Sequence, residues 1–468
     1  MGLGCKSKCQ GLFQVVGACL LLAACAPLPT PSTQVALPTH WREGPAAASQ
    51  ARQPDLHSWW TAFGDARLNR LVARALAHNL SLAQARARLK SATYRLDDRQ
   101  HRFYPTVQAG TQNAQPPNTT DAYFQFGLDA SWELGLFGRG QAVLEQARGA
   151  VDEAEANRLS VRVALVAEVA AQYLQLGAAQ RQAQHLQRLI QLDREREHLL
   201  QTRIRLGLTA HADLASLRAD MADVETQALM VQSQVQRHAQ RLAVLLGQAE
   251  PDADWFRPEP LPAITPPSPA LLPADLLRTR PDIQQAQAQV LQAAGDLGIA
   301  RADRYPQVSL EGGILWSTNL SRYHSGLPNF RATPLLGPII NIPLFDWGRR
   351  KAEENARGAL LRAAAFAYRD TVLKAVADVE NAFAGLTTAS RQVSLREQAL
   401  QAQTEAANAE QGLVTQGLAS PLEMLRVERL KLEAEGQLDS ARDHQALAFV
   451  TLYQAFGGPP LPPKAGGA

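Results

Sequence analysis

Apolar residues recur every three or four positions over two very long stretches of the chain, residues 138–247 and 348–457. After position 210 the pattern is strict, with steps of three and four between Leu214, Leu217, Met221, Val224, Ala228, Val231, Val235, His238, Leu242 and Leu245. Only His238 in this series is polar. A heptad pattern sustained over this length is typical of a coiled-coil seam. Each stretch is therefore predicted to form a long α-hairpin.

The two stretches are copies of one unit. A shift of 210 positions places Gly138 on Gly348, Gly207 on Gly417 and Gly247 on Gly457. A shift of 201 places Tyr104-Pro105 on Tyr305-Pro306, just upstream. Such self-similarity indicates an internal duplication. Residues 138–206 contain no proline, and a helix of that length would extend roughly 100 Å before turning at Gly207.

Upstream of each predicted α-hairpin the period changes from 3.6 to 2. Residues 124–134 alternate apolar and polar side chains, and residues 107–111 do so more weakly. In the second copy residues 308–316 alternate, and a return strand is expected at about 333–345. Strands of about ten residues with one apolar face match transmembrane β-strands, although a soluble two-stranded ribbon would give the same pattern. We predict β-hairpins at about 104–136 and 305–346.

Four strands cannot close a barrel, and in lipid no strand edge can stay unpaired. Symmetric association of two, three or four chains would give about 8, 12 or 16 strands. Because the inner strand faces are polar and the predicted helices are very long, the pattern favours a conduit. It would combine a membrane barrel with a helical tube.

The N-terminal residues have the features of an export signal. Lys6 and Lys8 precede an apolar run at about 11–24 that ends in Leu22-Ala23-Ala24-Cys25. This ending looks like a bacterial lipobox, which predicts a signal peptide at 1–24 and a lipidated (palmitate-bearing) Cys25; an ordinary signal with an incidental cysteine is the alternative. All four cysteines lie in this segment, so the mature chain should have no disulfide and no thiol metal site. No apolar run of 18 residues follows Cys25, so no membrane-spanning helix is expected.

The remaining boundaries follow from composition. Residues 25–55 are rich in Pro, Ala, Ser and Thr and are predicted to form a flexible, lipid-anchored tether. The first repeat then spans 56–247, a Pro-rich linker 248–273 and the second repeat 274–457. Residues 458–468 are expected to be disordered.

Charge and motifs exclude several functions. The formal net charge is +3, which gives no case for nucleic-acid binding. No zinc-protease, Walker or serine-elbow motif is present, so we expect no enzyme, no metal and no cofactor. His211 and Asp213 could form an acid–base pair, but a solvated turn at a helical tip explains them better. A structural coiled-coil lipoprotein without channel activity remains an alternative.

Several segments resemble TolC-like outer-membrane efflux lipoproteins. They are the start of the mature chain (Trp59-Trp60 to Leu82), the segment from Leu276 through Arg280-Pro281-Asp282 to Tyr305-Pro306, and the strand-to-helix junctions at Trp132–Arg139 and Pro343–Arg349. The resemblance implies an α+β membrane protein that forms a homotrimer. Such a trimer has a 12-stranded barrel in the outer membrane of a Gram-negative bacterium, a 12-helix periplasmic tunnel and a belt of short helices.

By the same resemblance, the protein would be the channel of a tripartite efflux system. It would conduct drugs or other small molecules passively from an inner-membrane RND-type pump and a periplasmic adaptor (membrane fusion protein). A duct for type I protein secretion is the alternative within this fold.

The resemblance also implies a functional site at the two hairpin turns. The predicted adaptor-contacting residues are Arg203, Gly207, Leu208, Thr209, Gly417, Leu418 and Ala419. Asp213 and Glu423 match acidic residues that constrict the periplasmic mouth in this family. Where the family often has a tyrosine and a second acid, this chain has Val414 and Arg426. We therefore expect a periplasmic aperture that includes Arg426, relies more on salt bridges and is more sensitive to salt. The alternative is that both acids are merely solvated.

Overall fold

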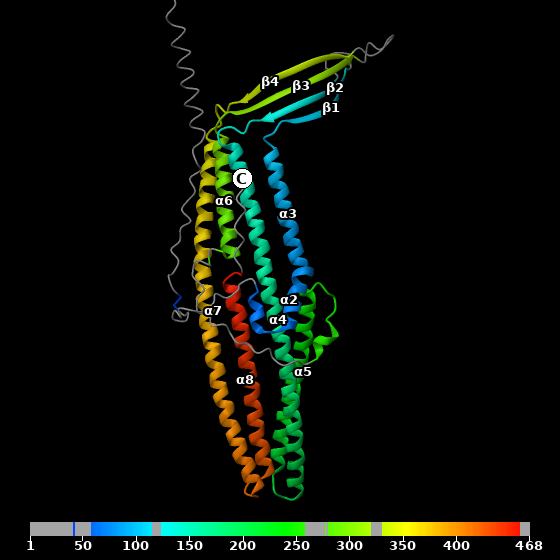
Figure 1. Cartoon of the computed structure of the whole chain (residues 1–468), viewed down its shortest axis with the longest axis vertical. Helices are drawn as coiled ribbons and strands as arrows, with labels where there is room; N and C mark the ends of the chain where they lie inside the picture. The colour runs from blue at the N-terminus through cyan, green and yellow to red at the C-terminus, as the bar shows by residue number, and fades with distance from the viewer. Residues whose placement is uncertain are drawn as a thin grey trace, which may run out of the picture. The chain divides into compact units, whose positions relative to one another are not determined.

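The structure, a computed structural model, describes residues 41–42, 58–114, 123–257, 277, 279–319 and 330–458. Long helices and a single four-stranded sheet make up most of it (Figure 1). In chain order the elements are η2 (Trp59–Phe63), α2 (Ala66–His78), α3 (Leu80–His101), β1 (Thr106–Ala114), β2 (Tyr123–Glu133), α4 (Arg139–Arg205), α5 (His211–Leu245), η3 (Ala253–Phe256), α6 (Pro281–Ala302), β3 (Gln307–Asn319), β4 (Arg331–Asn341), α7 (Arg349–Thr415) and α8 (Pro421–Ala455).

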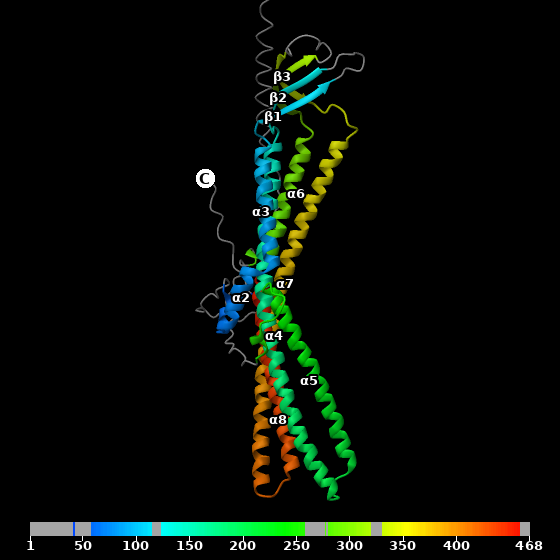
Figure 2. The ribbon, with the colours of Figure 1, turned by 90° about the vertical axis from the view of Figure 1, so that its right-hand side faces the viewer.

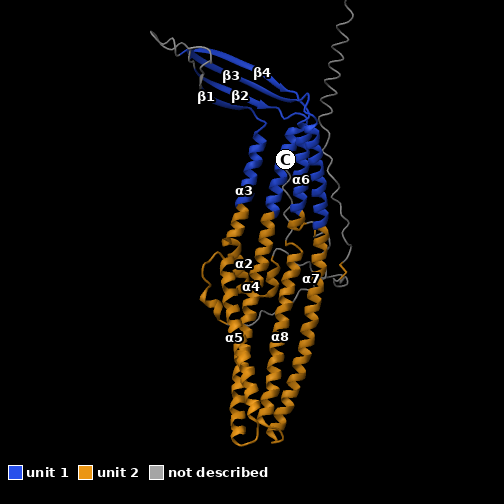
Figure 3. Ribbon diagram, turned by 180° about the vertical axis from the view of Figure 1, so that it is seen from behind, with its two compact units in different colours: residues 1–35, 87–156, 284–371 blue, residues 36–86, 157–283, 372–468 orange. Residues whose placement is uncertain are grey.

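The chain forms two compact units that cut across the sequence repeats (Figure 3). Of the described residues, unit 1 takes those within 87–156 and 284–371, and unit 2 takes those within 36–86, 157–283 and 372–468. Each unit therefore takes segments from both copies of the duplicated sequence. The duplication is visible in the backbone, because Gly207 and Gly417 adopt φ values of 71° and 73°, and Gly247 and Gly457 adopt 74° and 79°.

In unit 1 the strands form an antiparallel sheet in the order β1-β2-β3-β4, so that β1 and β4 are the two edges (Figure 1). The central pair joins the two repeats, with Glu133 opposite Ser309. Beside the sheet, α4 and α6 pack closely. A Cβ on Gly149 would lie 2.8 Å from Gln292, and one on Gly295 would lie 2.7 Å from Gln146. Glycine is therefore required at this helix contact.

The last strand differs from its sequence prediction. It was expected to run over about 333–345 with one apolar face, but β4 ends at Asn341. Within β4 the adjacent residues Leu335 and Leu336 are both exposed, and so are Ile339 and Ile340. Since adjacent residues point to opposite faces, both faces of this strand are apolar. The strand ends where it does because its partner β3 begins at Gln307, opposite Asn341.

In unit 2 the C-terminal part of α4 runs beside α5 (Figures 1 and 2). The predicted heptad seam is the contact between them: Val224 and Val231 pack on Ala179, Leu186 and Leu189. His238, the polar residue in the seam, bonds through Nδ1 to the side-chain oxygen of Gln172 at 2.9 Å. The polar side chain in the seam therefore has a hydrogen-bond partner.

The short helices α2 and η2 also lie in unit 2. Asn79 separates α2 from α3; its side-chain oxygen accepts a hydrogen bond from the Leu82 N–H, and its amide donates to the Leu245 carbonyl. Phe63 and Trp59 pack on the aromatic rings of Phe449 and Tyr453. These contacts fasten η2 to α8.

Two residues inside the segment predicted to be a tether have defined contacts. Trp41 packs against Phe383 and Phe456, with ring centroids 6.1 and 6.0 Å away, and the Arg42 N–H donates to Glu380. The predicted signal peptide, the remainder of the tether, most of the Pro-rich linker and the predicted disordered tail from 459 onward lie outside the described residues.

Within the described part of the chain, one helix is long and apolar enough over 18 residues to cross a membrane by composition alone. It is α4, Arg139–Arg205, and half of that apolar window is buried inside the protein. A core helix of a long bundle gives the same signal, so the finding is weak evidence for a membrane span.

Candidate functional site at the helical tips

The two hairpin turns share one backbone geometry. At the first, the Gly207 N–H donates to the Ile204 carbonyl at 2.9 Å and the Leu208 N–H donates to the Arg203 carbonyl at 2.8 Å. At the second, Gly417 and Leu418 donate to Val414 and Leu413 in the same way, at 3.0 and 2.9 Å. This is the Schellman termination of a helix, in which a left-handed residue, here glycine, follows the last turn.

The predicted adaptor-contacting side chains are largely accessible. Leu208 is 63% exposed and Leu418 is 71% exposed, whereas Thr209 and Ala419 are half-buried. The Arg203 guanidinium donates to the Thr209 hydroxyl at 3.1 Å and so stiffens the first tip. The hydrophobic residue of a Schellman motif usually packs back on its helix, but here both leucines remain mostly in water.

The two predicted aperture acids have different surroundings. At the second tip, Ser420 caps α8 by accepting from the Glu423 N–H, and the Glu423 carboxylate forms an ion pair with Arg426 at 2.5 Å. The hydrogen bond from Arg426 holds the pKa of Glu423 below its ordinary value. At the first tip Asp213 is exposed, and no side chain in the described part of the chain forms an ion pair with it. The structure thus brings Glu423 and Arg426 together within α8, whereas Asp213 lies on α5 and forms an ion pair with neither of them.

An ionic clamp that the sequence did not reveal joins the two α-hairpins above their tips. Asp193 of α4 is fully buried and binds Arg196 at 2.8 Å and Arg429 of α8 at 2.5 Å. Arg429 also binds Glu433 at 2.9 Å. A buried aspartate is stable only when its charge is paired, so Arg429 fixes α8 against α4.

A second contact between the same helices lines a cavity of about 710 Å³. Arg181 of α4 binds Asp443 of α8 at 2.5 Å, and burial raises the pKa of Asp443 to about 6 despite this arginine. His185 lies beside them, where burial lowers its pKa and its ring lies against Gly436. A Cβ at Gly436 would be 2.6 Å from the His185 Nε2, so only glycine admits the imidazole.

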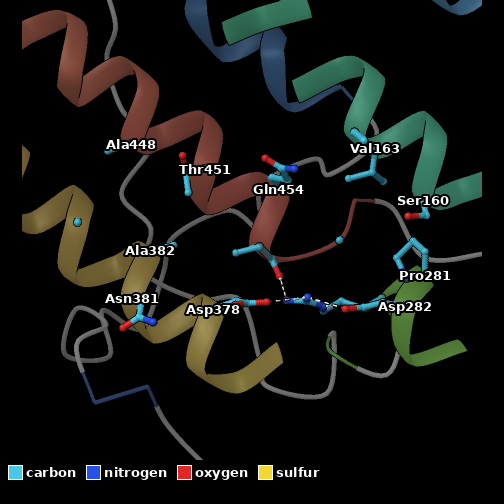
Figure 4. A pocket seen from close by; sticks show the side chains of 15 residues that line it. Ser160, Val163, Pro281, Asp282, Asp378, Asn381, Ala382, Ala448, Thr451 and Gln454 are labelled. Carbon is cyan, nitrogen blue, oxygen red and sulfur yellow. Dashed lines mark hydrogen bonds and ion pairs between the residues drawn. The ribbon is translucent and has the colours of Figure 1, made fainter. Parts of the chain in front are cut away.

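The Arg280-Pro281-Asp282 motif forms a third cluster, at a cavity of about 590 Å³ (Figure 4). The Arg280 guanidinium binds both carboxylate oxygens of Asp282, at 3.0 and 2.7 Å, and one of Asp378, at 3.1 Å. It also donates to the Ala455 carbonyl at the end of α8. A cation at a helix C-terminus is favourable, and Arg280 thereby links the start of α6 to α7 and α8.

The remaining candidate sites are the predicted lipidation site and a metal site. Cys25 lies outside the described residues, so its lipidation stays a prediction. Among the residues that the structure describes, no group of three or more His, Cys, Asp or Glu side chains could hold a metal ion.

Comparison with known proteins identifies the fold. The model of the outer membrane efflux protein family matches residues 71–248 and 272–458. The chain belongs to this family. It is therefore an outer-membrane channel of an efflux system, as the resemblance of its motifs indicated.

Individual relatives cover almost the whole chain. The chain is 29% identical to the pyoverdine export outer membrane protein OpmQ of Pseudomonas aeruginosa, over 95% of this chain and 96% of that protein. It is 28% identical to the probable efflux pump outer membrane protein TtgC of Pseudomonas putida, over 96% of each chain.

Solved structures give the same answer. The outer-membrane channel OprN superposes with a TM-score of 0.81 and 29% identity, over 93% of this chain and 99% of that chain. The open state of the MtrE outer membrane channel of Neisseria gonorrhoeae gives a TM-score of 0.76 at 25% identity, over 93% and 98%. The predicted α+β fold of the trimeric outer-membrane channels is thus confirmed for this family member.

Proposed function

We propose that this protein is the passive outer-membrane duct of a tripartite efflux system. It accepts drugs or other small molecules from a periplasmic adaptor and an RND-type inner-membrane pump, and its two helical tips form the docking face for the adaptor. The exported cargo of the relatives, pyoverdine in one case, supports a small-molecule substrate rather than a secreted protein.

One observation carries the proposal for the tips. Two turns that are far apart in sequence repeat one backbone geometry and each leave a leucine mostly in water, Leu208 and Leu418. Closing the turn requires only the glycine with positive φ. An exposed leucine beside it contributes little to the fold and is suited to bury apolar area on a partner.

Crosslinking tests this docking face. Leu208→Ser with Leu418→Ser should reduce crosslinking to the adaptor several-fold while the yield of trimer stays unchanged. Leu229→Ser is the matched control, because Leu229 is 70% exposed but lies in the middle of α5. Equal crosslinking by the tip variant and the control would show that the tips only turn the chain.

The aperture is the second part of the proposal. Asp213 and Glu423 occupy equivalent places, six residues past Gly207 and Gly417. Around a three-fold axis they supply up to six carboxylates, and a ring of carboxylates attracts cations. Because the ion pair of Glu423 with Arg426 is exposed, salt weakens it, and the mouth should respond to ionic strength.

Divalent-cation block tests the ring. Asp213→Asn with Glu423→Gln keeps the side-chain shapes and removes the charges, so block of the channel by Mg²⁺ should weaken markedly. Asp220→Asn is the control, because Asp220 is also an exposed acid on α5 but lies seven residues beyond Asp213. Block that is identical in wild type and the double variant would exclude these acids from the aperture.

A further inference from the structure

The two edges of the sheet offer unequal sets of hydrogen-bonding groups. The Leu134 N–H donates to the Val308 carbonyl, so even-numbered residues of β3 point their backbone groups at β2 and odd-numbered ones point at β4. In the register of β3 with β4, odd residues face odd residues, such as Gly313 opposite Leu335. The Leu335 carbonyl indeed approaches β3, lying 3.3 Å from where a Cβ on Gly312 would be.

The even residues of β4 therefore point their backbone groups at the free edge: Ala332, Pro334, Leu336, Pro338 and Ile340. Two of these five are prolines, which have no N–H to donate. By the same alternation, β1 presents its odd residues at the opposite edge: Val107, Ala109, Thr111 and Asn113. A copy that pairs its β1 with β4 must do so in a register that tolerates the missing donors.

Beyond β4 the chain exposes large apolar side chains that its own fold does not cover. Leu344 and Trp347 are each 90% exposed. The equivalent residues in the first repeat, 210 positions earlier, are Leu134 and Phe137, and both are half-buried. The backbones match, since Phe137 and Trp347 have the unusual positive φ values of 54° and 56°.

What covers the first-repeat residues is visible in the same chain. Phe137 stacks on Tyr305, with ring centroids 5.3 Å apart and planes at 14°, and the Leu134 N–H donates to Val308. Tyr305 and Val308 belong to the start of the second repeat, and their equivalents 201 positions earlier are Tyr104 and Val107. Those two are also exposed, at 60% and 68%.

We propose that a second copy of this chain covers Leu344 and Trp347, with Tyr104 and Val107 of the next protomer in the places of Tyr305 and Val308. The Trp347 ring then stacks on Tyr104, and the Leu344 N–H donates to the Val107 carbonyl. This deepens the proposed channel by fixing the register of the seam between protomers, and it rests on that assembly.

The prolines agree with this register. With Leu344 opposite Val107, Pro338 lies opposite Asn113 and Pro334 falls beyond the end of β1 at Ala114. A register shifted by four residues would place Ile340 opposite Val107. Both prolines would then lie opposite β1 residues, and two β1 carbonyls would have no N–H donor in the membrane. This register also pairs the correct residues. It places even-numbered residues of β4 opposite odd-numbered residues of β1, and both sets point their backbone N–H and C=O groups at the free edges.

Disulfide scanning of the full-length protein tests the register. Cysteines occur naturally only at positions 5, 9, 19 and 25, and single-cysteine variants control for bonds through Cys25. Val107→Cys is combined with Leu344→Cys, Ile342→Cys or Ile340→Cys. Cα atoms of directly opposed residues lie about 5.5 Å apart, within disulfide range, so the first pair should give covalent dimers and trimers far more efficiently than the others.

The outcomes separate the seam from the channel. Strongest bonding through position 342 or 340 would overturn the register while leaving the trimer intact. Protein that stays monomeric and bonds in no pair would overturn the assembly and with it the proposed duct. A trimer that bonds in no pair would mean that lipid, not a second copy, covers Leu344.

A second measurement tests the aromatic contact. Trp347→Ala and Tyr104→Ala should each shorten the half-life of the trimer in detergent. The double variant should lose less than the sum of the two single losses, because each single variant already removes the same contact. Tyr94→Ala is the matched control, since Tyr94 is also 60% exposed but lies on α3. Strictly additive losses, or a loss equal to that of the control, would overturn the stack.

Discussion

At the scale of single residues, Arg280 makes several polar contacts through one side chain. Its guanidinium forms ion pairs with Asp282 and Asp378 and donates a hydrogen bond to the carbonyl that ends α8. The Arg280 residue is only 7% exposed. The sequence pointed to Arg280-Pro281-Asp282 only through its resemblance to a family. The structural reason is that a rigid, planar fork can hold several acceptors at once, which lysine cannot do.

Arg280→Lys should therefore destabilise the protein by about 1–3 kcal/mol, and Arg280→Met by more, because buried acceptors lose their donors. The partners Asp282 and Asp378 are about half exposed, so water compensates part of the loss. The readout is the thermal unfolding temperature. Arg257→Lys is the control, since Arg257 pairs with Asp254 in the open, and it should change stability by less than about 0.5 kcal/mol.

Asp443 predicts a dependence of stability on pH. Its pKa in the folded protein, about 6, lies above the ordinary value near 3.9, because burial disfavours the carboxylate. The folded state thus binds the proton more tightly than the unfolded chain. The stability from this group is fully present below about pH 4 and is lost as the pH rises through about 6.

Asp443→Asn should remove this component, so that the difference in unfolding temperature between variant and wild type changes across pH 4–6 and is constant above about pH 7. Asp254→Asn provides the control, because Asp254 is exposed. A difference that stays constant over the whole range would show that burial does not raise the pKa of Asp443 above its value in the unfolded chain.

At the scale of the elements, periodicity determined most of what could be predicted. The heptad steps of 214–245 correspond to α5, and the alternation of 124–134 corresponds to β2. The end of β4 was missed, because strand length depends on the partner strand and not on the strand itself. The clamp of Asp193 with Arg429 was also missed: its two charges lie 236 positions apart and are not repeated in the other copy.

The two glycine turns were predicted correctly, since Gly207 and Gly417 interrupt helical patterns, whereas the contact of these tips with an adaptor stays a prediction. It paired Asp213 with Glu423 by equivalence in the repeat, and that pairing remains a prediction because it depends on neighbouring chains. Trp41 lay in a segment whose composition indicated a tether. The Trp41 side chain nonetheless packs on Phe383 and Phe456, and an average over the composition of a segment does not reveal the contact of one aromatic residue.

The repeated glycines allow a test at this scale. Gly207 and Gly247 both have positive φ, but a Cβ at Gly207 would meet nothing within 4 Å, whereas one at Gly247 would lie 2.7 Å from the His78 carbonyl. Gly207→Ala should cost about 1–2 kcal/mol from backbone strain alone. Gly247→Ala should cost clearly more, measured by chemical denaturation. Equal losses would show that α2 yields freely at this contact.

At the scale of the whole molecule, the protein is an outer-membrane channel of an efflux system. It belongs to the outer membrane efflux protein family, and it has a four-stranded sheet with two free edges and two long α-hairpins. A structural coiled-coil lipoprotein would need the helices but would have no use for a sheet whose edges require neighbouring copies.

Single-channel recording of the purified trimer in planar bilayers tests this claim most directly. We expect discrete conductance steps for the wild type and larger ones for Asp213→Asn with Glu423→Gln, in which carboxylates no longer bind cations or hold Arg426 at the mouth. Correctly assembled trimer that inserts into the bilayer and conducts in neither form would contradict the duct.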